Sequence, residues 1–208
     1  MTLMIDGPED AALTLVFGHG AGLPMDAPFM TTFAQGLAAK GYRVVRFEFP
    51  YMAERRETGT KRPPDRLPAL AQAFGVAVNA AQIPADRLVL AGKSMGGRLA
   101  TILVDEAGAR AAVVFGYPFH PPQKPENLRT KHLEKVQAPV LICQGTRDNF
   151  GTKKEVEGYS LSPAVEIAWI EDGDHHFVPR QASGRTEEQN CAAAIDAATA
   201  FLDRIAIG

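Results

Sequence analysis

Residues 88–97 read Leu-Val-Leu-Ala-Gly-Lys-Ser-Met-Gly-Gly, and they carry the strongest local signal in the chain. This stretch opens with an apolar run that is typical of a strand buried on both faces, and a segment of helical period begins at Met95. Between the two stands a G-x-S-x-G sequence centred on Ser94. A serine between a strand and a helix, flanked by glycines, is typical of a nucleophile elbow, a sharp turn that presents the hydroxyl group. Ser94 is therefore the candidate nucleophile.

The rest of the chain alternates short, β-rich apolar runs with longer segments of helical period. The pattern predicts strands at 13–17, 42–49, 87–91, 111–115, 140–144 and 165–170, and helices at 29–40, 67–81, 95–106 and 186–205. Residues 51–66, rich in Arg, Gly and Pro, are predicted to form a loop, and 128–136 a short helical piece. Strands that alternate with helices through short connections predict a three-layer α/β fold with a mostly parallel central sheet.

Length and composition favour one compact domain over residues 1–208. The chain is 46% hydrophobic, and its formal net charge is -2. A nucleic-acid-binding protein would show a concentrated basic face, and here Lys and Arg are spread along the chain apart from a cluster within residues 55–66. We interpret that cluster as a solvated loop, which would also favour an acidic substrate. We expect no nucleic-acid partner, and the oligomeric state is open.

The first twelve residues carry Asp6, Glu9 and Asp10 where a secretory signal would need apolar residues. No segment is long and apolar enough to span a bilayer. The two cysteines, Cys143 and Cys191, match neither a metal clip nor a disulfide framework, so we expect two reduced, mostly buried thiols. These features predict a cytoplasmic protein without a membrane partner.

A serine hydroxyl needs a base, and the base needs an orienting acid. On a fold with a nucleophile elbow, the acid and then the histidine follow the serine, each directly after a strand. Asp148 follows the predicted strand at 140–144, and His175 follows the one at 165–170, so both position and order fit. The neighbouring His176 is the alternative base.

Two further acids, Asp172 and Asp174, lie in the loop of the histidine itself. We interpret them as turn-forming residues, because an acid from a separate strand end is the better orienter.

Ester cleavage passes through an oxyanion that backbone N–H groups must stabilise. One donor is expected at Met95, the residue after the nucleophile, and a second in the loop Gly18-His19-Gly20-Ala21-Gly22. Ala21 is the first choice for this second donor and Gly20 the alternative. We expect His19 to lie beneath the loop and hold it through hydrogen bonds, and not to act as a base.

The sequence predicts no metal and no cofactor. The histidines lack the spacing of a metal site. Gly92-Lys93-Ser94 matches the end of a phosphate-binding loop, but Arg87 stands where that loop needs a glycine.

Six segments together resemble the α/β-hydrolase superfamily, and within it the dienelactone-hydrolase-like group. The most similar members form a small family that includes a testis-expressed hydrolase-like protein and a subunit of a chromatin acetyltransferase complex. The segments are Gly18–Gly22, Arg46–Met52, Ala91–Arg98, Gly116–Pro122, Gln144–Asp148 and Asp172–Phe177. The resemblance implies the α/β-hydrolase fold, a triad of Ser94, Asp148 and His175, and hydrolase activity. Dienelactone hydrolases carry cysteine at the position of Ser94, so the resemblance does not extend to their substrate.

The interval between the strands at 111–115 and 140–144 is too short for a large lid, so we expect an open site with no lid or a minimal one. Such a site suits short-acyl esters or accessible bonds of a polyester. Candidate residues for substrate contact at the rim are Leu23, Tyr51, Phe119, Phe150 and Phe177, with Met52, Met95 and Tyr117 beside them.

The leading hypothesis is a carboxylic ester hydrolase that forms an acyl-enzyme on Ser94 and acts on a small-molecule or polymeric ester. Thioester cleavage or acyl transfer would use the same residues on another bond or acceptor. The third hypothesis is a non-catalytic binding protein on a hydrolase fold.

Overall fold

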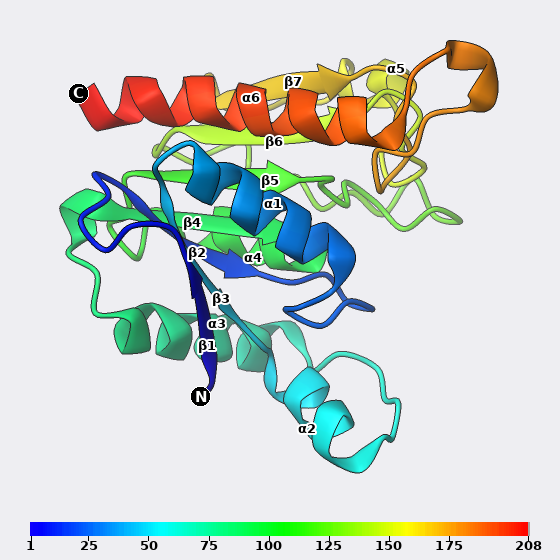
Figure 1. Cartoon of the computed structure of the whole chain (residues 1–208). Helices are drawn as coiled ribbons and strands as arrows, with labels where there is room; N and C mark the ends of the chain where they lie inside the picture. Colours follow the sequence, from blue (N-terminus) through cyan, green and yellow to red (C-terminus); the bar gives the residue numbers. More distant parts are fainter. Residues whose placement is uncertain (208) are drawn as a thin grey trace.

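The computed structural model describes residues 1–207, and its central feature is one seven-stranded sheet (Figure 1). Across the sheet the strands are β1 (Leu3–Asp6), β3 (Arg43–Phe47), β2 (Thr14–Gly18), β4 (Leu88–Lys93), β5 (Ala111–Phe115), β6 (Val140–Gly145) and β7 (Val165–Ile170). The edge strand β1 pairs antiparallel with β3, and every other pairing is parallel. The sheet is therefore mostly parallel, as predicted.

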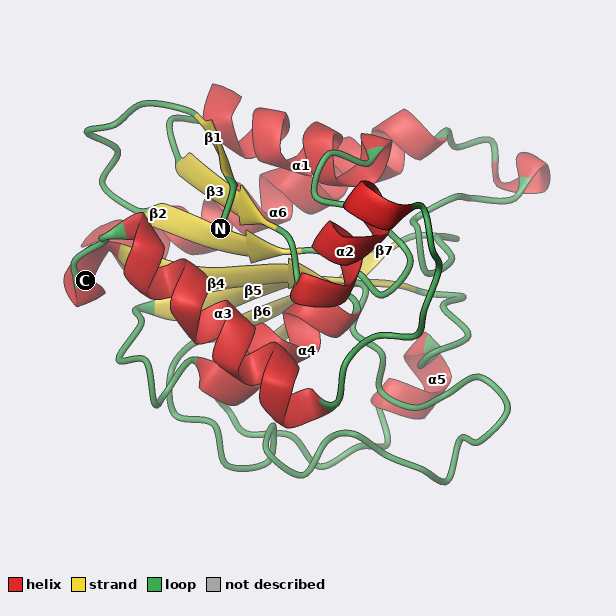
Figure 2. Ribbon diagram, turned by 90° about the horizontal axis from the view of Figure 1, so that it is seen from below, coloured by secondary structure: helices red, strands yellow, loops and turns green. Residues whose placement is uncertain are grey.

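Helices cover both faces of the sheet, which makes three layers (Figures 1 and 2). The helices α1 (Pro28–Ala39) and α6 (Glu187–Ile207) lie on one face, and α3 (Leu67–Ala81) and α4 (Met95–Leu103) lie on the other. Two shorter helices, α2 (Pro50–Thr58) and α5 (Lys153–Val156), follow the ends of β3 and β6.

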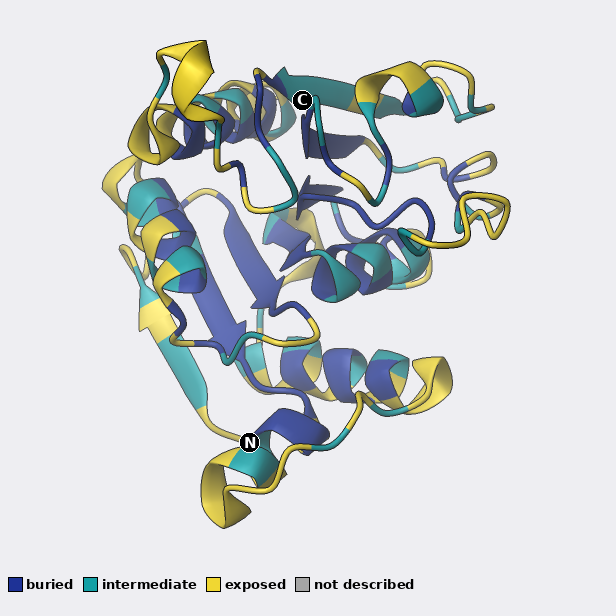
Figure 3. Cartoon of the chain, turned by 90° about the vertical axis from the view of Figure 1, so that its right-hand side faces the viewer, coloured by how far each residue is buried: buried dark blue, intermediate teal, exposed yellow. Residues whose placement is uncertain are grey.

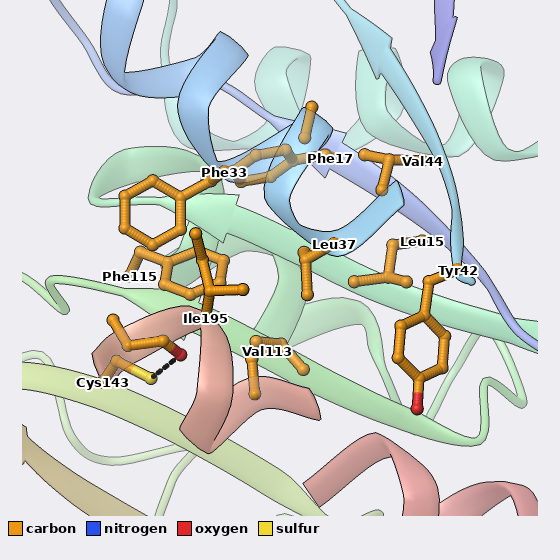
Figure 4. Packing of buried hydrophobic residues seen from close by; sticks show 14 of the residues in the cluster. Leu15, Phe17, Phe33, Leu37, Tyr42, Val44, Val113, Phe115, Cys143 and Ile195 are labelled. Carbon is orange, nitrogen blue, oxygen red and sulfur yellow. Dashed lines mark hydrogen bonds between the residues drawn. The ribbon is translucent and has the colours of Figure 1, made fainter. Parts of the chain in front are cut away.

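Each face of the sheet has its own apolar core, because strand side chains alternate between the two faces. On β5, Val113 packs with α1 and α6, whereas Val114 packs on the side of α3 and α4. Figure 4 shows the first core, in which Phe33 and Ile195 meet the strand side chains. Burying such a side chain stabilises the fold by roughly 1.5–3 kcal/mol.

The inner strands β2 to β6 are buried, the edge strands β1 and β7 are only partly buried, and the outer helix surfaces are exposed (Figure 3). Cys143 on β6 is buried, and its thiol donates to the carbonyl oxygen of Ala194 at 3.6 Å (Figure 4). Both Cys143 and Cys191 are free and buried, and burial raises the pKa of the Cys143 thiol to about 12.

The carboxyl ends of the parallel strands meet at one edge of the sheet. The register aligns Gly18 of β2 with Gly92 of β4, and Gly92 with Val114 of β5. The loops after β2, β4, β6 and β7 therefore start side by side, and this edge is where open α/β sheets bind their ligands.

The prediction of a loop at 51–66 is wrong for the first half of that segment, because residues 50–58 form the helix α2. Pro50 stands at its first turn, where proline is preorganised for a helix, and Gly59 ends it with a φ of 73°. Tyr51 and Met52 anchor the helix in the core. The Arg residues that contributed to the loop prediction, and the Glu residues between them, are good helix formers once that anchor exists.

Three smaller expectations also change. Residues 128–136 form turns and not a helix, although Val136 N–H donates to the His132 carbonyl at 3.0 Å in a single helical turn. The strand β1 was not expected, because it is a short edge strand with exposed positions such as Ile5. The helix α5 begins with a capping box in which Thr152 and Glu155 bond each other.

Residues 116–139, between β5 and β6, contain no helix or strand. This interval is where a lid would be inserted, and it supplies only a loop at the rim of the site. Among residues 1–207, no helix has both the length and the apolar character needed to cross a membrane.

Candidate active site

Ser94 stands at the turn between β4 and α4, at the carboxyl edge of the sheet. Its φ of 50° and ψ of -110° are a strained backbone conformation for a residue other than glycine. A Cβ atom on Gly92 would lie 2.1 Å from the carbonyl carbon of Gly96, and one on Gly96 would lie 2.2 Å from the oxygen of Gly18. The turn can close this tightly only because these positions are glycine.

His175 lies between Ser94 and Asp148, in hydrogen-bonding contact with both. The distance from Ser94 Oγ to His175 Nε2 is 2.9 Å, and from His175 Nδ1 to Asp148 Oδ2 it is 2.7 Å. The carboxylate of Asp148 accepts a hydrogen bond from Nδ1–H, so Nε2 is left to accept a proton from the hydroxyl. The structure thus brings together the three predicted side chains from the ends of β4, β6 and β7.

The electrostatics of His175 favour the neutral ring. Burial, and then the nearby ammonium of Lys93, lower the pKa of His175, while the hydrogen bond to Asp148 acts in the opposite direction. The phenyl ring of Phe150 covers the imidazole, with ring centroids 4.3 Å apart. A neutral imidazole is the form that can act as a base.

Asp148 is fully buried and is held by two donors besides His175. The Phe150 N–H donates to Oδ1 at 2.8 Å, and the Gln144 side-chain amide donates to Oδ2 at 2.9 Å. The Gln144 oxygen in turn accepts the N–H of Tyr117 at 2.7 Å. Sequence reasoning did not single out Gln144 as a site residue, because its role depends on contacts with Asp148 and with Tyr117 after the neighbouring strand β5.

The alternative residues of the histidine loop have other partners. Asp174 accepts the backbone N–H groups of His176 at 2.8 Å and Val178 at 3.0 Å, as a turn-forming residue does. The carboxylate of Asp172 bonds Arg180, whose backbone N–H lies 2.7 Å away. His176 is exposed beside His175, and neither of its ring nitrogens bonds Ser94 in the described structure.

The loop after β2 is fixed from below by two side chains. His19 is fully buried, and its Nε2 accepts the Phe49 N–H at 3.0 Å while its Nδ1 donates to the Gly20 carbonyl at 2.8 Å. Burial lowers the pKa of His19 to about 4, so the ring is neutral. The Tyr51 hydroxyl donates to the Ala21 carbonyl at 2.8 Å. His19 therefore holds the loop, as expected.

The backbone N–H groups of Ala21 and Met95 have no acceptor within residues 1–207. Both residues line the same hollow as Ser94. The N–H of Ala21 belongs to the same peptide unit as the Gly20 carbonyl, so the His19 bond also sets the direction of this donor. These two groups are available to a developing negative charge.

Two open hollows flank Ser94. The first, of about 360 Å³, we call the arginine hollow; its lining includes Ser94, Met95, Arg98, Arg129 and Phe150. The second, of about 270 Å³, we call the histidine hollow; its lining includes Leu23, Ser94, Phe150, His175 and His176.

Of the rim residues expected to contact substrate, Leu23, Met95 and Phe150 line these hollows. The others are buried and line neither, so we no longer assign them to substrate contact: Tyr51, Met52, Tyr117, Phe119 and Phe177. Phe177 packs in the core with α1, and Phe119 packs against Tyr117, with ring centroids 4.7 Å apart. Tyr51 still reaches the site through its hydroxyl.

Lys93 is a buried residue that the sequence suggested only as part of a nucleotide motif. Its side chain is 1% exposed, and Nζ donates to the His175 carbonyl. It also lies 5.1 Å from the centre of the Phe29 ring. Burial lowers the pKa of Lys93 to about 7.

Two arginines of the basic cluster within residues 55–66 are paired with acids. Arg56 bonds Glu48 at 2.6 Å, and Arg62 bonds both Glu54 and Asp65 at 2.7 Å. In residues 1–207, no group of three or more His, Cys, Asp or Glu side chains is placed to hold a metal ion.

Several solved structures are similar to this chain over most of its length. An esterase domain from a Rhodothermus marinus protein superposes with a TM-score of 0.65 at 17% identity, covering 96% of this chain and 91% of that one. A dienelactone hydrolase from Anabaena variabilis superposes with a TM-score of 0.69 at 20% identity, covering 97% of this chain and 90% of that one. A serine hydrolase without a lid from Xanthomonas campestris superposes with a TM-score of 0.63 at 22% identity, covering 92% of this chain and 85% of that one.

At these identities the similarity establishes the fold, a three-layer α/β-hydrolase fold that also occurs without a lid. The sequence itself matches the family model described as "Alpha/beta hydrolase domain" over residues 11–203. That range runs from the start of β2 almost to the end of α6 and includes every residue of the site described above. The chain is thus a member of the alpha/beta hydrolase domain family.

Proposed function

We propose that the protein is a serine esterase that cleaves carboxylic esters through an acyl-enzyme on Ser94. The observation that carries this proposal is the continuous chain of hydrogen bonds from Ser94 Oγ through His175 to Asp148, with distances of 2.9 and 2.7 Å. Such a chain converts a weakly nucleophilic hydroxyl into a nucleophile.

In this mechanism Ser94 Oγ attacks the ester carbonyl carbon while His175 Nε2 takes the hydroxyl proton. The tetrahedral intermediate collapses, and His175 returns the proton to the leaving alcohol. A water molecule, deprotonated by His175, then attacks the acyl-enzyme and releases the acid. Asp148 remains ionised throughout, holding Nδ1–H and stabilising the transient imidazolium.

The N–H groups of Ala21 and Met95 serve as the oxyanion hole. They are unbonded in the described structure and face the same hollow as Ser94. Loss of one such donor typically costs about 100- to 1,000-fold in turnover. His19 and Tyr51 act as positioning residues, because they fix the two carbonyl groups on either side of Ala21.

The open site suits short-acyl esters and accessible bonds of a polyester. No helix or strand of residues 116–139 covers Ser94, and both hollows open to solvent. We also place the chain in the dienelactone-hydrolase-like group on its motif segments, and consider residues 1–208 to be one catalytic domain without a cofactor.

The decisive test is turnover of 4-nitrophenyl butyrate by wild type and Ser94→Ala, together with labelling by a fluorophosphonate probe. Wild type is expected to turn over and to be labelled on Ser94, and Ser94→Ala to lose both while keeping its circular dichroism spectrum. The matched control is Ser160→Ala, an exposed serine far along the chain. A wild-type protein that neither reacts nor labels would favour a non-catalytic binding role.

A further inference from the structure

Two arginines face the site next to the candidate nucleophile. Arg98 lies one turn beyond Ser94 on α4, and its backbone N–H donates to the Ser94 carbonyl at 2.9 Å. Arg129 comes from the loop between β5 and β6. Both side chains line the arginine hollow together with Ser94 and Met95.

Neither arginine has a counterion in the structure. Within residues 1–207, no acidic side chain forms an ion pair with Arg98 or Arg129, and the Nε of Arg98 is buried without any hydrogen-bond partner. Asp65, the acid on the wall of the hollow, is paired with Arg62 at 2.7 Å. Guanidinium groups that line a hollow without a counterion are favourable partners for an anionic ligand.

The polar side chains beneath Arg98 are neutral. The Tyr117 hydroxyl lies 3.3 Å from His132 Nε2, which also bonds Thr101 at 2.9 Å. Burial, and then the charge of Arg98, lower the pKa of His132 to about 4, so this ring is uncharged at neutral pH. Burial and the charge of Arg98 likewise lower the pKa of Arg129. The two cations therefore repel each other without local compensation.

The backbone that carries Arg129 is fixed, although it belongs to a loop. Its N–H donates to the Phe119 carbonyl at 2.8 Å, and its carbonyl accepts the Tyr117 hydroxyl at 2.8 Å. Both aromatic residues are fully buried. The guanidinium is thus delivered to the hollow from an ordered base, as a binding site requires.

The proposed mechanism determines which part of an ester would meet the arginines. His175 must reach the leaving oxygen to protonate it, and His175 lines the histidine hollow. The alcohol part therefore leaves on that side. The acyl part extends into the other hollow, which contains Arg98 and Arg129 and has apolar walls from Leu67, Leu70 and Pro118.

We propose that the arginine hollow binds a carboxylate at the far end of the acyl group, so that the substrate is a hemiester of a short dicarboxylic acid. This inference rests on the proposed esterase function and specifies its substrate class. Guanidinium groups match carboxylates with paired, charge-assisted hydrogen bonds, and the apolar walls suit the methylene groups in between.

The test compares monomethyl adipate with dimethyl adipate, its uncharged analogue, by methanol release at pH 7.5. Wild type is expected to show the higher kcat/KM on the hemiester. The double variant Arg98→Gln/Arg129→Gln is expected to lose at least about tenfold more kcat/KM on the hemiester than on the diester, the scale of one hydrogen bond to a charged group. If the two arginines had a purely structural role, the double variant would lose kcat/KM equally on both substrates.

Arg66→Gln is the matched control, because Arg66 is exposed and does not line the hollow although both of its neighbours do. It removes one positive charge near the site and is expected to leave the substrate preference unchanged. A loss of preference in Arg66→Gln equal to that in the double variant would overturn the assignment to Arg98 and Arg129.

Binding of adipate, measured by calorimetry with 1,6-hexanediol as the neutral comparison, separates the two proposals. A wild type that cleaves dimethyl adipate without preferring the hemiester overturns the carboxylate site and leaves the esterase proposal standing. If neither adipate ester nor 4-nitrophenyl butyrate is cleaved, the esterase proposal fails. Adipate binding that is lost in the double variant then still supports the carboxylate site, and equal binding by both proteins overturns it.

Discussion

The ammonium group of Lys93 lies 2.5 Å from the backbone carbonyl oxygen of His175, 82 positions further along the chain. Lys93 directly precedes Ser94, so one buried cation links the turn of the candidate nucleophile to the loop of the candidate base. Its ammonium group bonds neither ring nitrogen of His175, so Lys93 is a positioning residue. Its positive charge also lowers the pKa of His175.

Replacing Lys93 is expected to change the pH profile of ester cleavage. The Lys93 charge lowers the pKa of His175, so Lys93→Gln, which keeps a donor but not the charge, should raise that pKa. His175 acts as a base only when neutral, so the acidic limb of kcat/KM should move to higher pH. Lys131→Gln, at an exposed lysine, serves as control. An acidic limb that stays in place in Lys93→Gln would contradict the electrostatic role.

The same residue should make stability depend on pH. Burial lowers the pKa of Lys93 from 10.5 to about 7, so between these values the unfolded chain binds more protons than the folded one. The free energy of unfolding of the wild type therefore rises with pH through this window, because the cost of burying a charged Lys93 disappears as the group loses its proton. Lys93→Met lacks this rise, so its free energy of unfolding should fall relative to wild type, by on the order of 1–3 kcal/mol, between about pH 7 and 10. Urea denaturation at several pH values measures the difference, and a constant difference would refute the prediction.

Tyr51→Phe tests the support of the oxyanion loop. The change removes only the hydroxyl that bonds the Ala21 carbonyl and leaves the buried ring in place. We expect kcat to fall roughly tenfold with little change in KM, less than the loss of a direct oxyanion donor. Tyr159→Phe is the matched control, because its hydroxyl bonds no residue among 1–207. Equal kcat values for the two variants would show that the Ala21 carbonyl needs no such anchor.

Two glycines should respond to alanine in opposite directions. A Cβ atom on Gly75, inside α3, meets nothing within 4 Å, so Gly75→Ala should stabilise the protein by about 0.5–1 kcal/mol. A Cβ atom on Gly96 would lie 2.2 Å from the Gly18 oxygen, so Gly96→Ala should disrupt the site and lower the melting temperature. Thermal unfolding of both variants checks the pair.

The sequence predicted most of the sheet and the residues that meet at its carboxyl edge. Ser94, Asp148 and His175 were identifiable because each follows a predicted strand, and strand ends in a parallel sheet converge. The elements that were not predicted are short or depend on packing. β1 is an exposed edge strand, and α2 is held by the burial of Tyr51 under the loop after β2.

The side chains around the site were harder to predict, because their environment depends on the tertiary structure. Phe119 and Phe177 looked like rim aromatics, and the fold buries both. Arg98 and Arg129 carried no local signal, because a lack of counterions is visible only once the whole chain has been assembled around them.

The proposed triad joins the ends of β4, β6 and β7, and its serine and histidine are separated by 81 positions. The two bonds can therefore form only after the carboxyl-terminal half of the sheet has paired, and such long-range pairing is slow to form in folding. Recovery of ester cleavage during refolding would report this closing step. A nascent or damaged chain with an incomplete sheet would carry an inert serine, so the architecture itself delays reactivity until the molecule is whole.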